Sequence, residues 1–232
     1  YLDEISVATF TKNEEYKNLP QTLADIDMLG YKHVSVVSIN IFPTDEHEVL
    51  KKIVDGFKHF SLANISCTNA LLTKTKETTA FLKDLNEQIS KDDTANLYVI
   101  HGTPRLDTIG IDSISYSASF LELISENNFT CSLEGAFPYF EINDVIKSRI
   151  EKLGLKKVQV VPLLLVSGNH YIEDMFEIKD DLSDKFESFI VPSLTKSEKF
   201  NLIELPMIQN IIEKNIQNTF KMMGISHKEI TY

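Results

Sequence analysis

The sequence predicts an α/β fold with parallel β-sheets, and two observations support this prediction. Short runs of β-branched and aromatic residues, bounded by turn residues, alternate with amphipathic stretches of helical length. Several of these runs, such as Val158-Gln159-Val160-Val161, are almost continuously apolar, as expected for strands that helices cover on both faces. A third observation, an internal repeat, predicts two similar halves.

The expected elements follow one another in helix–strand pairs along the chain. In the first half, amphipathic helices at residues 19–29 and 46–57 lead to apolar strands at residues 34–42 and 61–67, and a helix at 76–89 leads to the first strand of the second half at 97–101. In the second half, helices at 113–127 and 142–153 lead to strands at 129–134 and 158–166. A strand at 186–191 and a helix at 206–223 complete the chain.

The internal repeat relates residues 30–38 to residues 154–162. Each copy has a glycine that ends a helix, then a pair of basic residues, a buried strand and a polar loop. The same comparison places the counterpart of strand 97–101 before Tyr1, so we expect an initial strand and its helix to be absent from the N-terminal half. The alternative is coincidence, because a glycine, a basic residue and a strand form a common sequence in α/β proteins.

The composition excludes several classes of protein. With 43% hydrophobic residues, 8 Gly and 7 Pro in 232 residues, the chain is neither disordered nor of low complexity. A net charge of −11 argues against a nucleic-acid partner or an anionic membrane surface. The longest apolar run, residues 158–166, is far shorter than the ~20 residues of a membrane-spanning helix. Cys67 and Cys131 form no CxxC motif, which favours a reducing compartment, and we expect a cytoplasmic protein.

Three polar segments lie where apolar strands end, the place where parallel α/β sheets bind ligands. They carry His101, Glu134 and His170, and we expect these side chains to converge in the second half. Two imidazoles and a carboxylate suit a divalent first-row metal such as Co, Ni, Zn or Fe, and an imidazole is a natural general base. Taken singly, each residue could instead cap a turn or a helix start.

Other polar residues have weaker patterns. Arg105 follows the His101 loop, where its guanidinium could bind a ligand carboxylate. Glu173 and Asp174 suit the first turn of a further helix. Walker A, GxGxxG and GxSxG motifs are absent from the sequence, so we expect no nucleotide or redox cofactor. The remaining histidines lie on helix ends or polar stretches and are expected at the surface: His33, His47, His59 and His227.

The three strand-end segments resemble the anaerobic sirohydrochlorin cobaltochelatases, a family of class II tetrapyrrole chelatases. His101-Gly102-Thr103 is similar to the family's catalytic histidine motif, and Leu133-Glu134-Gly135-Ala136-Phe137-Pro138 is similar to its second motif with a metal-ligating glutamate. The segment 162–175, which contains Ser167-Gly168-Asn169-His170 and Asp174-Met175, resembles the third motif with its metal-ligating histidine. The likeness extends to about Asp181, and Asn169 replaces the aspartate that is usual in the family.

The resemblance implies a fold of two similar Rossmann-like halves. We expect an incomplete N-terminal half at residues 1–93, a C-terminal half carrying the motifs at 94–205, and a C-terminal helical segment at 206–232 that packs back on the N-terminal half. The implied site has His101 as catalytic base, with His101, Glu134 and His170 as metal ligands. Arg105, Thr103 and Asn169 are the expected substrate-binding residues.

The implied activity is that of a lyase that inserts Co2+ as a substrate into a tetrapyrrole such as sirohydrochlorin, in anaerobic cobalamin biosynthesis. One alternative is a chelatase for Fe2+ or Ni2+, because two histidines and one glutamate discriminate weakly among these ions. Another is a non-catalytic tetrapyrrole or metal carrier on the same fold, because the likeness fades after Asp181. The expected partner is the small-molecule tetrapyrrole, and homo-oligomer formation stays open.

Overall fold

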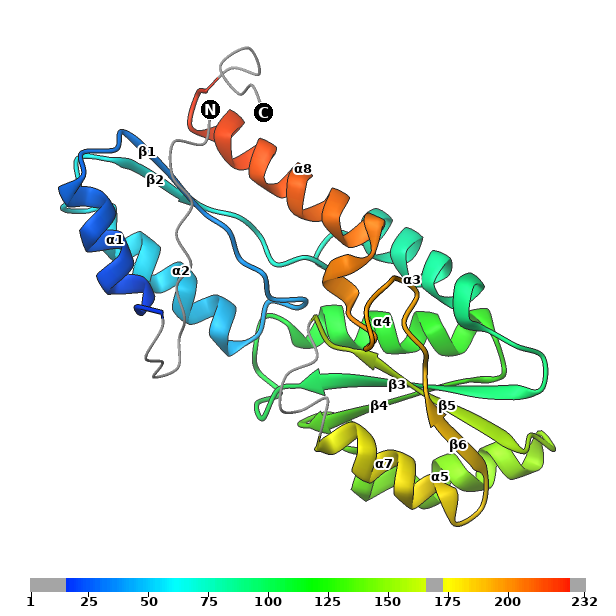
Figure 1. Ribbon diagram of the computed structural model, residues 1–232. Coiled ribbons are helices and arrows are strands. Elements are labelled where there is room, and N and C mark those ends of the chain that lie inside the picture. The colour runs from blue at the N-terminus through cyan, green and yellow to red at the C-terminus, as the bar shows by residue number, and fades with distance from the viewer. Residues whose placement is uncertain (1–15, 166–172, 226–232) are drawn as a thin grey trace. The chain divides into compact units, whose positions relative to one another are not determined.

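Residues 16–165 and 173–225 are described by the computed structural model (Figure 1). Contacts divide the chain into unit 1, residues 1–71 with 210–232, and unit 2, residues 72–209. The domain boundaries expected from the sequence, after residues 93 and 205, stay a prediction. The expected absence of an initial strand and helix concerns the start of the chain, which lies outside the described residues.

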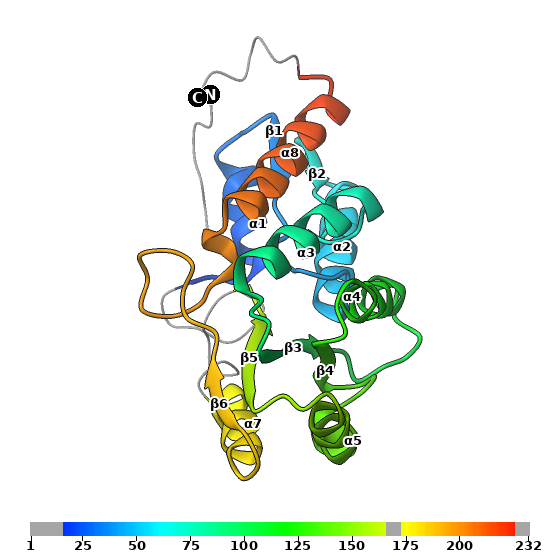
Figure 2. The same cartoon turned by 90° about the vertical axis from the view of Figure 1, so that its right-hand side faces the viewer.

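Unit 2 is an α/β layer structure around a four-stranded parallel sheet. The strands are β3 (Thr94–Gly102), β4 (Asn128–Glu134), β5 (Lys157–Leu163) and β6 (Glu187–Ile190), in the order β4-β3-β5-β6. Helices α3 (Thr75–Ile89) and α4 (Ile111–Ile124) cover one face of the sheet, and α5 (Tyr139–Lys152) and α7 (Asp174–Ser183) cover the other (Figures 1 and 2). The predicted α/β class with parallel strands is confirmed.

The central strand β3 explains why the apolar runs of the sequence show no alternation. Every residue of β3 is buried except His101, because strands pair with it on both sides and helices cover both faces of the sheet.

A short 3-10 helix (Leu202–Glu204) leads from unit 2 into α8 (Pro206–Met222), whose residues from Asn210 onward belong to unit 1. No helix among residues 16–165 and 173–225 is long and apolar enough to cross a membrane.

A buried row of amides sets the register at the amino ends of the strands. Asn96 of β3 is the register partner of both Asn128 in β4 and Gln159 in β5. The Asn96 side chain donates to Asn128 Oδ1 at 2.7 Å and accepts from Gln159 Nε2 at 2.5 Å. Because a shifted register would leave these buried amides without partners, the row favours one alignment of the three strands.

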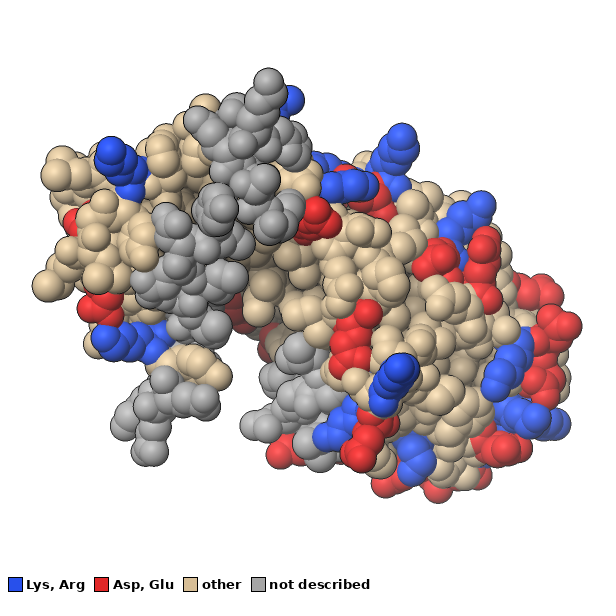
Figure 3. All heavy atoms as spheres, turned by 45° about the horizontal axis from the view of Figure 1, so that its top comes forward, with Lys and Arg blue, Asp and Glu red and all other residues tan. Residues whose placement is uncertain are grey.

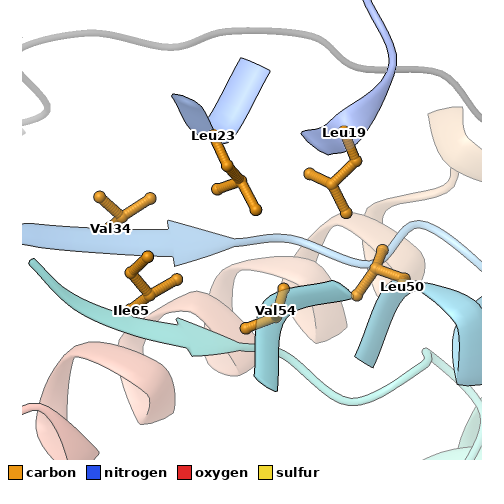
Figure 4. Packing of buried hydrophobic residues seen from close by; sticks show 6 residues of the cluster. All are labelled: Leu19, Leu23, Val34, Leu50, Val54 and Ile65. Carbon is orange, nitrogen blue, oxygen red and sulfur yellow. The ribbon is translucent and has the colours of Figure 1, made fainter. Parts of the chain in front are cut away.

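Unit 1 contains a two-stranded parallel sheet in its described part. Its elements are α1 (Leu19–Met28), β1 (His33–Val36), α2 (Asp45–Phe57) and β2 (Asn64–Cys67), together with most of α8. The sheet packs on the apolar faces of α1 and α2, and the core side chains point toward one another (Figure 4). This core consists of Leu19, Leu23, Val34, Leu50, Val54 and Ile65.

The two copies of the sequence repeat have the same local geometry. Gly30 follows α1 with φ 77°, and Gly154 follows α5 with φ 73°. Each amide donates to a carbonyl three residues earlier, Gly30 to Asp27 and Gly154 to Glu151. A left-handed residue at this position ends a helix at little cost only if it is glycine. Each glycine then leads into a strand, β1 or β5, as the repeat predicts.

Four predicted strands, at 34–42, 61–67, 158–166 and 186–191, are longer than the observed ones, and the first and third end where their ladders lose a partner. The strand expected at 34–42 ends at Val36, whose carbonyl accepts from Thr68 N. Beyond it the Thr68 hydroxyl, rather than a backbone carbonyl, accepts from Ser38 N at 2.8 Å, so the ladder stops. The strand expected at 158–166 ends at Leu163, and the Leu165 carbonyl instead accepts from Ile203 N at 3.1 Å. Apolar residues continue past the ends of both ladders, where Phe42 and Leu164 stay buried although Ile39 is 55% exposed.

The prediction that His47 lies at the surface is wrong. His47 is 4% exposed, and its Nδ1 lies 2.8 Å from the Ser38 hydroxyl, which also donates to Asn40 Oδ1 at 3.0 Å. Burial, together with the charge of Lys51, lowers the pKa of this imidazole. The sequence places His47 in a polar stretch, but the residue lies on the inner face of α2. His33 and His59 are exposed as predicted, and His227 lies outside the described residues.

Candidate metal and substrate site

The site begins where β3 and β4 end side by side. Gly102 is the register partner of Glu134, and a Cβ atom on Gly102 would lie 1.9 Å from the Glu134 carbonyl oxygen. One residue further, a Cβ on Gly135 would lie 1.7 Å from the Thr103 carbonyl oxygen. Both glycines have positive φ, 84° and 78°. Only glycine allows the two backbones to approach so closely at these positions.

This close approach brings His101 and Glu134 together. His101 Nδ1 lies 3.6 Å from Glu134 Oε1 and 3.5 Å from the Gly102 carbonyl oxygen. The two side chains are 39% and 46% exposed, so a ligand can reach both of them. These two oxygens near Nδ1 suit the tautomer with its proton on Nδ1, in which Nε2 carries the lone pair that a base or a metal ligand uses.

The structure describes two of the three expected metal ligands. His170 and Asn169 lie in residues 166–172, outside the described part. Within the described ranges, no group of three or more His, Cys, Asp or Glu side chains is arranged to hold a metal ion. Asp174 begins α7, and the next residue, Met175, is fully buried and anchors this helix to the core. His101 and Glu134 therefore form the described part of the candidate site.

The loop after Glu134 turns back onto its own strand. The backbone N–H of Ser132 donates to the Phe137 carbonyl at 3.0 Å, and the Ser132 hydroxyl donates to the Ala136 carbonyl at 2.5 Å. Phe137 has φ 62° and is the one non-glycine residue with positive φ in residues 16–165 and 173–225. This conformation costs about 1–2 kcal/mol for an ordinary residue. The loop therefore holds a strained residue three positions from Glu134.

Thr103 is the residue that directly follows the end of β3. It is 2% exposed, and its hydroxyl oxygen makes no hydrogen bond to the part of the protein that the structure describes. A buried hydroxyl without a partner costs about 1–3 kcal/mol. Such a group is rare in native proteins and commonly marks a functional position.

Arg105 lies in the same loop but is engaged locally. Its Nε and Nη2 donate to the two carboxylate oxygens of Asp107 at 3.0 and 3.1 Å, and both side chains are exposed. On the face drawn in Figure 3, acidic and basic side chains are interspersed over unit 2. Because Asp107 already accepts two hydrogen bonds from Arg105, an anionic ligand would compete with Asp107 for this guanidinium.

A buried ion pair joins the helices on either side of the third motif. Lys147 Nζ of α5 lies 2.8 Å from Asp181 Oδ2 of α7, and the lysine side chain is only 8% exposed. The same carboxylate accepts from Tyr139 OH at 2.7 Å and from Asn143 Nδ2 at 3.2 Å. The α5 helix directly follows the Glu134 loop. The network therefore fixes the start of α5 relative to α7.

Several of these residues were not predicted from the sequence. Tyr139, Asn143 and Lys147 recur at i, i+4 and i+8, a spacing that places all three on one face of a helix and could have revealed them. Phe137 has no such signal. A residue before proline is normally extended, so the Phe137-Pro138 pair predicts the opposite of the observed backbone.

An imidazole and a carboxylate at adjacent strand ends can bind a divalent metal ion and can accept protons. The sequence model of the cobalt chelatase (CbiK) family matches residues 7–221, so the chain belongs to this family of metal chelatases. The resemblance found in the three motifs is confirmed.

Solved structures with this fold include other chelatases. The sirohydrochlorin chelatase SirB from Bacillus subtilis subspecies spizizenii, in complex with cobalt, has a TM-score of 0.60 at 14% identity, covering 93% of this chain and 80% of that protein. SirB from Bacillus subtilis with Fe3+ has a TM-score of 0.65 at 15% identity, with coverages of 95% and 83%. DR2241 from Deinococcus radiodurans, a multi-domain protein similar to chelatases, has a TM-score of 0.54 at 14% identity, with coverages of 86% and 43%.

Proposed function

We propose that this protein inserts a divalent metal ion, Co2+, into a tetrapyrrole such as sirohydrochlorin. The observation that carries this proposal is the pair of His101 and Glu134, 3.6 Å apart and accessible at adjacent strand ends, in a chain that belongs to the cobalt chelatase family. The SirB relatives, solved with cobalt and with Fe3+, support a transition metal as substrate.

The reaction requires proton acceptors as well as metal ligands. Insertion of a divalent ion replaces two pyrrole N–H protons, so two protons leave the ring for each metal ion that enters. In the proposed mechanism His101 accepts one proton at Nε2, and its contact with the Glu134 carboxylate stabilises the imidazolium. The Glu134 carboxylate accepts the second proton, and both groups then release their protons to solvent, because their side chains are 39% and 46% exposed.

The same two side chains would hold the incoming ion before transfer. An imidazole nitrogen and a carboxylate oxygen bind Co2+, Ni2+, Fe2+ and Zn2+, with affinities that follow the Irving–Williams order of divalent first-row metals. His170 is proposed as the third ligand. Because the ion must leave the protein for the ring, weak coordination by few ligands suits a metal that is a substrate.

The test measures turnover under anaerobic conditions. The protein is mixed with sirohydrochlorin and Co2+, and the visible spectrum of the ring is followed over time. We expect His101→Ala to lower the rate of insertion by about 100-fold or more, as for loss of a general base. His59→Ala is the matched control, because His59 is an exposed histidine at the end of α2, and we expect its rate to equal that of the wild type.

The alternatives give different results in the same assay. A static spectral shift, stoichiometric with protein and without turnover, would identify a tetrapyrrole carrier and contradict the proposed activity. Faster insertion of Fe2+ or Ni2+ than of Co2+ at equal concentrations would keep the chelatase and change the metal. The cytoplasmic location, the place in anaerobic cobalamin biosynthesis, and the substrate-binding roles of Arg105, Thr103 and Asn169 are further predictions of this proposal.

A further inference from the structure

The position of Phe137 is unusual for an aromatic residue in a loop. Its backbone is left-handed at φ 62°, and it precedes Pro138, which makes helical backbone angles still less favourable. The residue is nevertheless 42% exposed, so burial of the ring does not explain why the loop adopts this conformation. Strained residues of this kind concentrate at ligand-binding positions.

The surrounding contacts hold the backbone of Phe137 rather than its ring. Ser132 bonds to the carbonyls of Ala136 and Phe137, and a β-bridge joins Ser132 to Pro138. On the other side of Phe137, Tyr139 is 1% exposed and donates to Asp181. Both ends of the loop are therefore fixed, and the left-handed residue between them turns its ring outward.

A second loop at the same sheet edge also presents apolar side chains. Leu106 and Ile109 are each 69% exposed in the segment that follows His101. The segments that follow His101 and Glu134 at this sheet edge therefore both carry exposed apolar side chains. An apolar, planar ligand with polar atoms at its centre matches this combination of groups.

We propose that Phe137 is a substrate-binding residue whose ring packs against the face or edge of the tetrapyrrole and positions the macrocycle over His101 and Glu134. This inference rests on the proposed function and adds a residue to it. It assigns Phe137 to binding of the macrocycle and gives it no role in binding of the metal ion.

A ligand-binding role and a structural role of Phe137 predict opposite effects on stability. If the ring only stabilised the loop, its removal would lower the thermal midpoint. If the ring serves the ligand, Phe137→Asn removes it and relieves the backbone, because asparagine tolerates positive φ better than other non-glycine residues. We therefore expect Phe137→Asn to be at least as thermostable as the wild type and to bind the tetrapyrrole about tenfold more weakly.

The experiment measures three quantities on the full chain. They are the dissociation constant of sirohydrochlorin by absorbance titration without metal, the dissociation constant of Co2+ by calorimetry, and the thermal midpoint. We expect Phe137→Asn to weaken binding of sirohydrochlorin, to leave that of Co2+ unchanged and to keep or raise the thermal midpoint, and we expect Phe137→Tyr, which keeps a ring, to bind sirohydrochlorin like the wild type. Leu123→Ala is the control, because Leu123 is 83% exposed near the end of α4, which leads to the opposite end of β4.

The outcomes separate this inference from the proposed function. If the wild type binds sirohydrochlorin and Phe137→Asn binds it equally well, the inference is wrong and the proposed function stands. The inference would also be wrong if Phe137→Asn lost affinity for sirohydrochlorin and for Co2+ and had a lower thermal midpoint, because these losses together would show that the loop had collapsed. If the wild type binds no tetrapyrrole, both proposals fail together.

Discussion

Gly102 and Glu134 are register partners at the ends of two parallel strands, and a Cβ atom on Gly102 would lie 1.9 Å from the carbonyl oxygen of Glu134. This approach is closer than any residue with a side chain permits. It explains how an imidazole and a carboxylate from separate motifs come within 3.6 Å of each other. Gly102 therefore contributes to the site by positioning His101 and Glu134, although it has no reactive group of its own.

Replacement of Gly102 by alanine should destabilise the protein strongly. We expect Gly102→Ala to lower the free energy of unfolding by about 3 kcal/mol or more, because the methyl group meets a backbone oxygen that cannot rotate away. Gly154→Ala is the control, since Gly154 has φ 73° but no atom within 4 Å of the added Cβ, and we expect a loss of about 1 kcal/mol. Urea denaturation measures both values, and equal losses would contradict the steric explanation.

The buried hydroxyl of Thr103 offers a test of its expected role in substrate binding. Valine has nearly the shape of threonine without the hydroxyl, so Thr103→Val removes an oxygen that has no partner among the described residues. We expect the thermal midpoint to stay the same or rise, and the affinity for sirohydrochlorin to fall about fivefold, which corresponds to one lost hydrogen bond. A lower thermal midpoint with unchanged affinity would assign the hydroxyl to the fold instead.

The Lys147–Asp181 pair should make stability depend on pH in the acid range. Burial alone would raise the pKa of Asp181, but hydrogen bonds from Lys147, Tyr139 and Asn143 outweigh it and hold this pKa below its ordinary value. The unfolded state then binds the proton more readily, so the stabilisation is present above about pH 4 and is lost as the pH falls further.

A substitution at this position separates the contribution of the pair. We expect Asp181→Asn to cost about 2 kcal/mol at pH 7, since it leaves Lys147 buried without a counter-charge, and the difference from the wild type to shrink below pH 4. Denaturant titrations from pH 3 to 7 measure this profile. Asp180→Asn is the control, because the neighbouring Asp180 is 70% exposed, and its profile should follow the wild type. A constant difference across the pH range would show that ionisation of Asp181 is not involved.

Asp107 should weaken the interaction of Arg105 with an anionic substrate. Asp107→Asn removes the carboxylate that accepts two hydrogen bonds from the guanidinium. We expect the KM for sirohydrochlorin to fall about two- to threefold at low salt and the effect to disappear at high salt, because both side chains are exposed. Arg105→Ala should raise KM under the same conditions. If neither variant changes KM, Arg105 does not contact the substrate.

Much of the fold of unit 2 could be predicted because its signals are local. The apolar runs of β3, β4 and β5 and the amphipathic stretches between them are properties of neighbouring residues, and the structure places these elements close to the expected boundaries. His101 and Glu134 were found for a related reason, since each directly follows or ends such a run. The strand 34–42 was predicted too long because apolar character reports burial and does not report where a ladder loses its partner.

The sequence by itself determined the alternation of helices and strands, the glycine positions after α1 and α5, and the polar residues at the strand ends. Only the tertiary structure decided that β3 lies beside β4, that His47 is buried, that Lys147 meets Asp181 across two helices, and that Phe137 is left-handed. The physical reason is that periodicity along the chain records which face of an element is covered. Which residues meet across that face depends on register and on backbone conformations held by distant contacts.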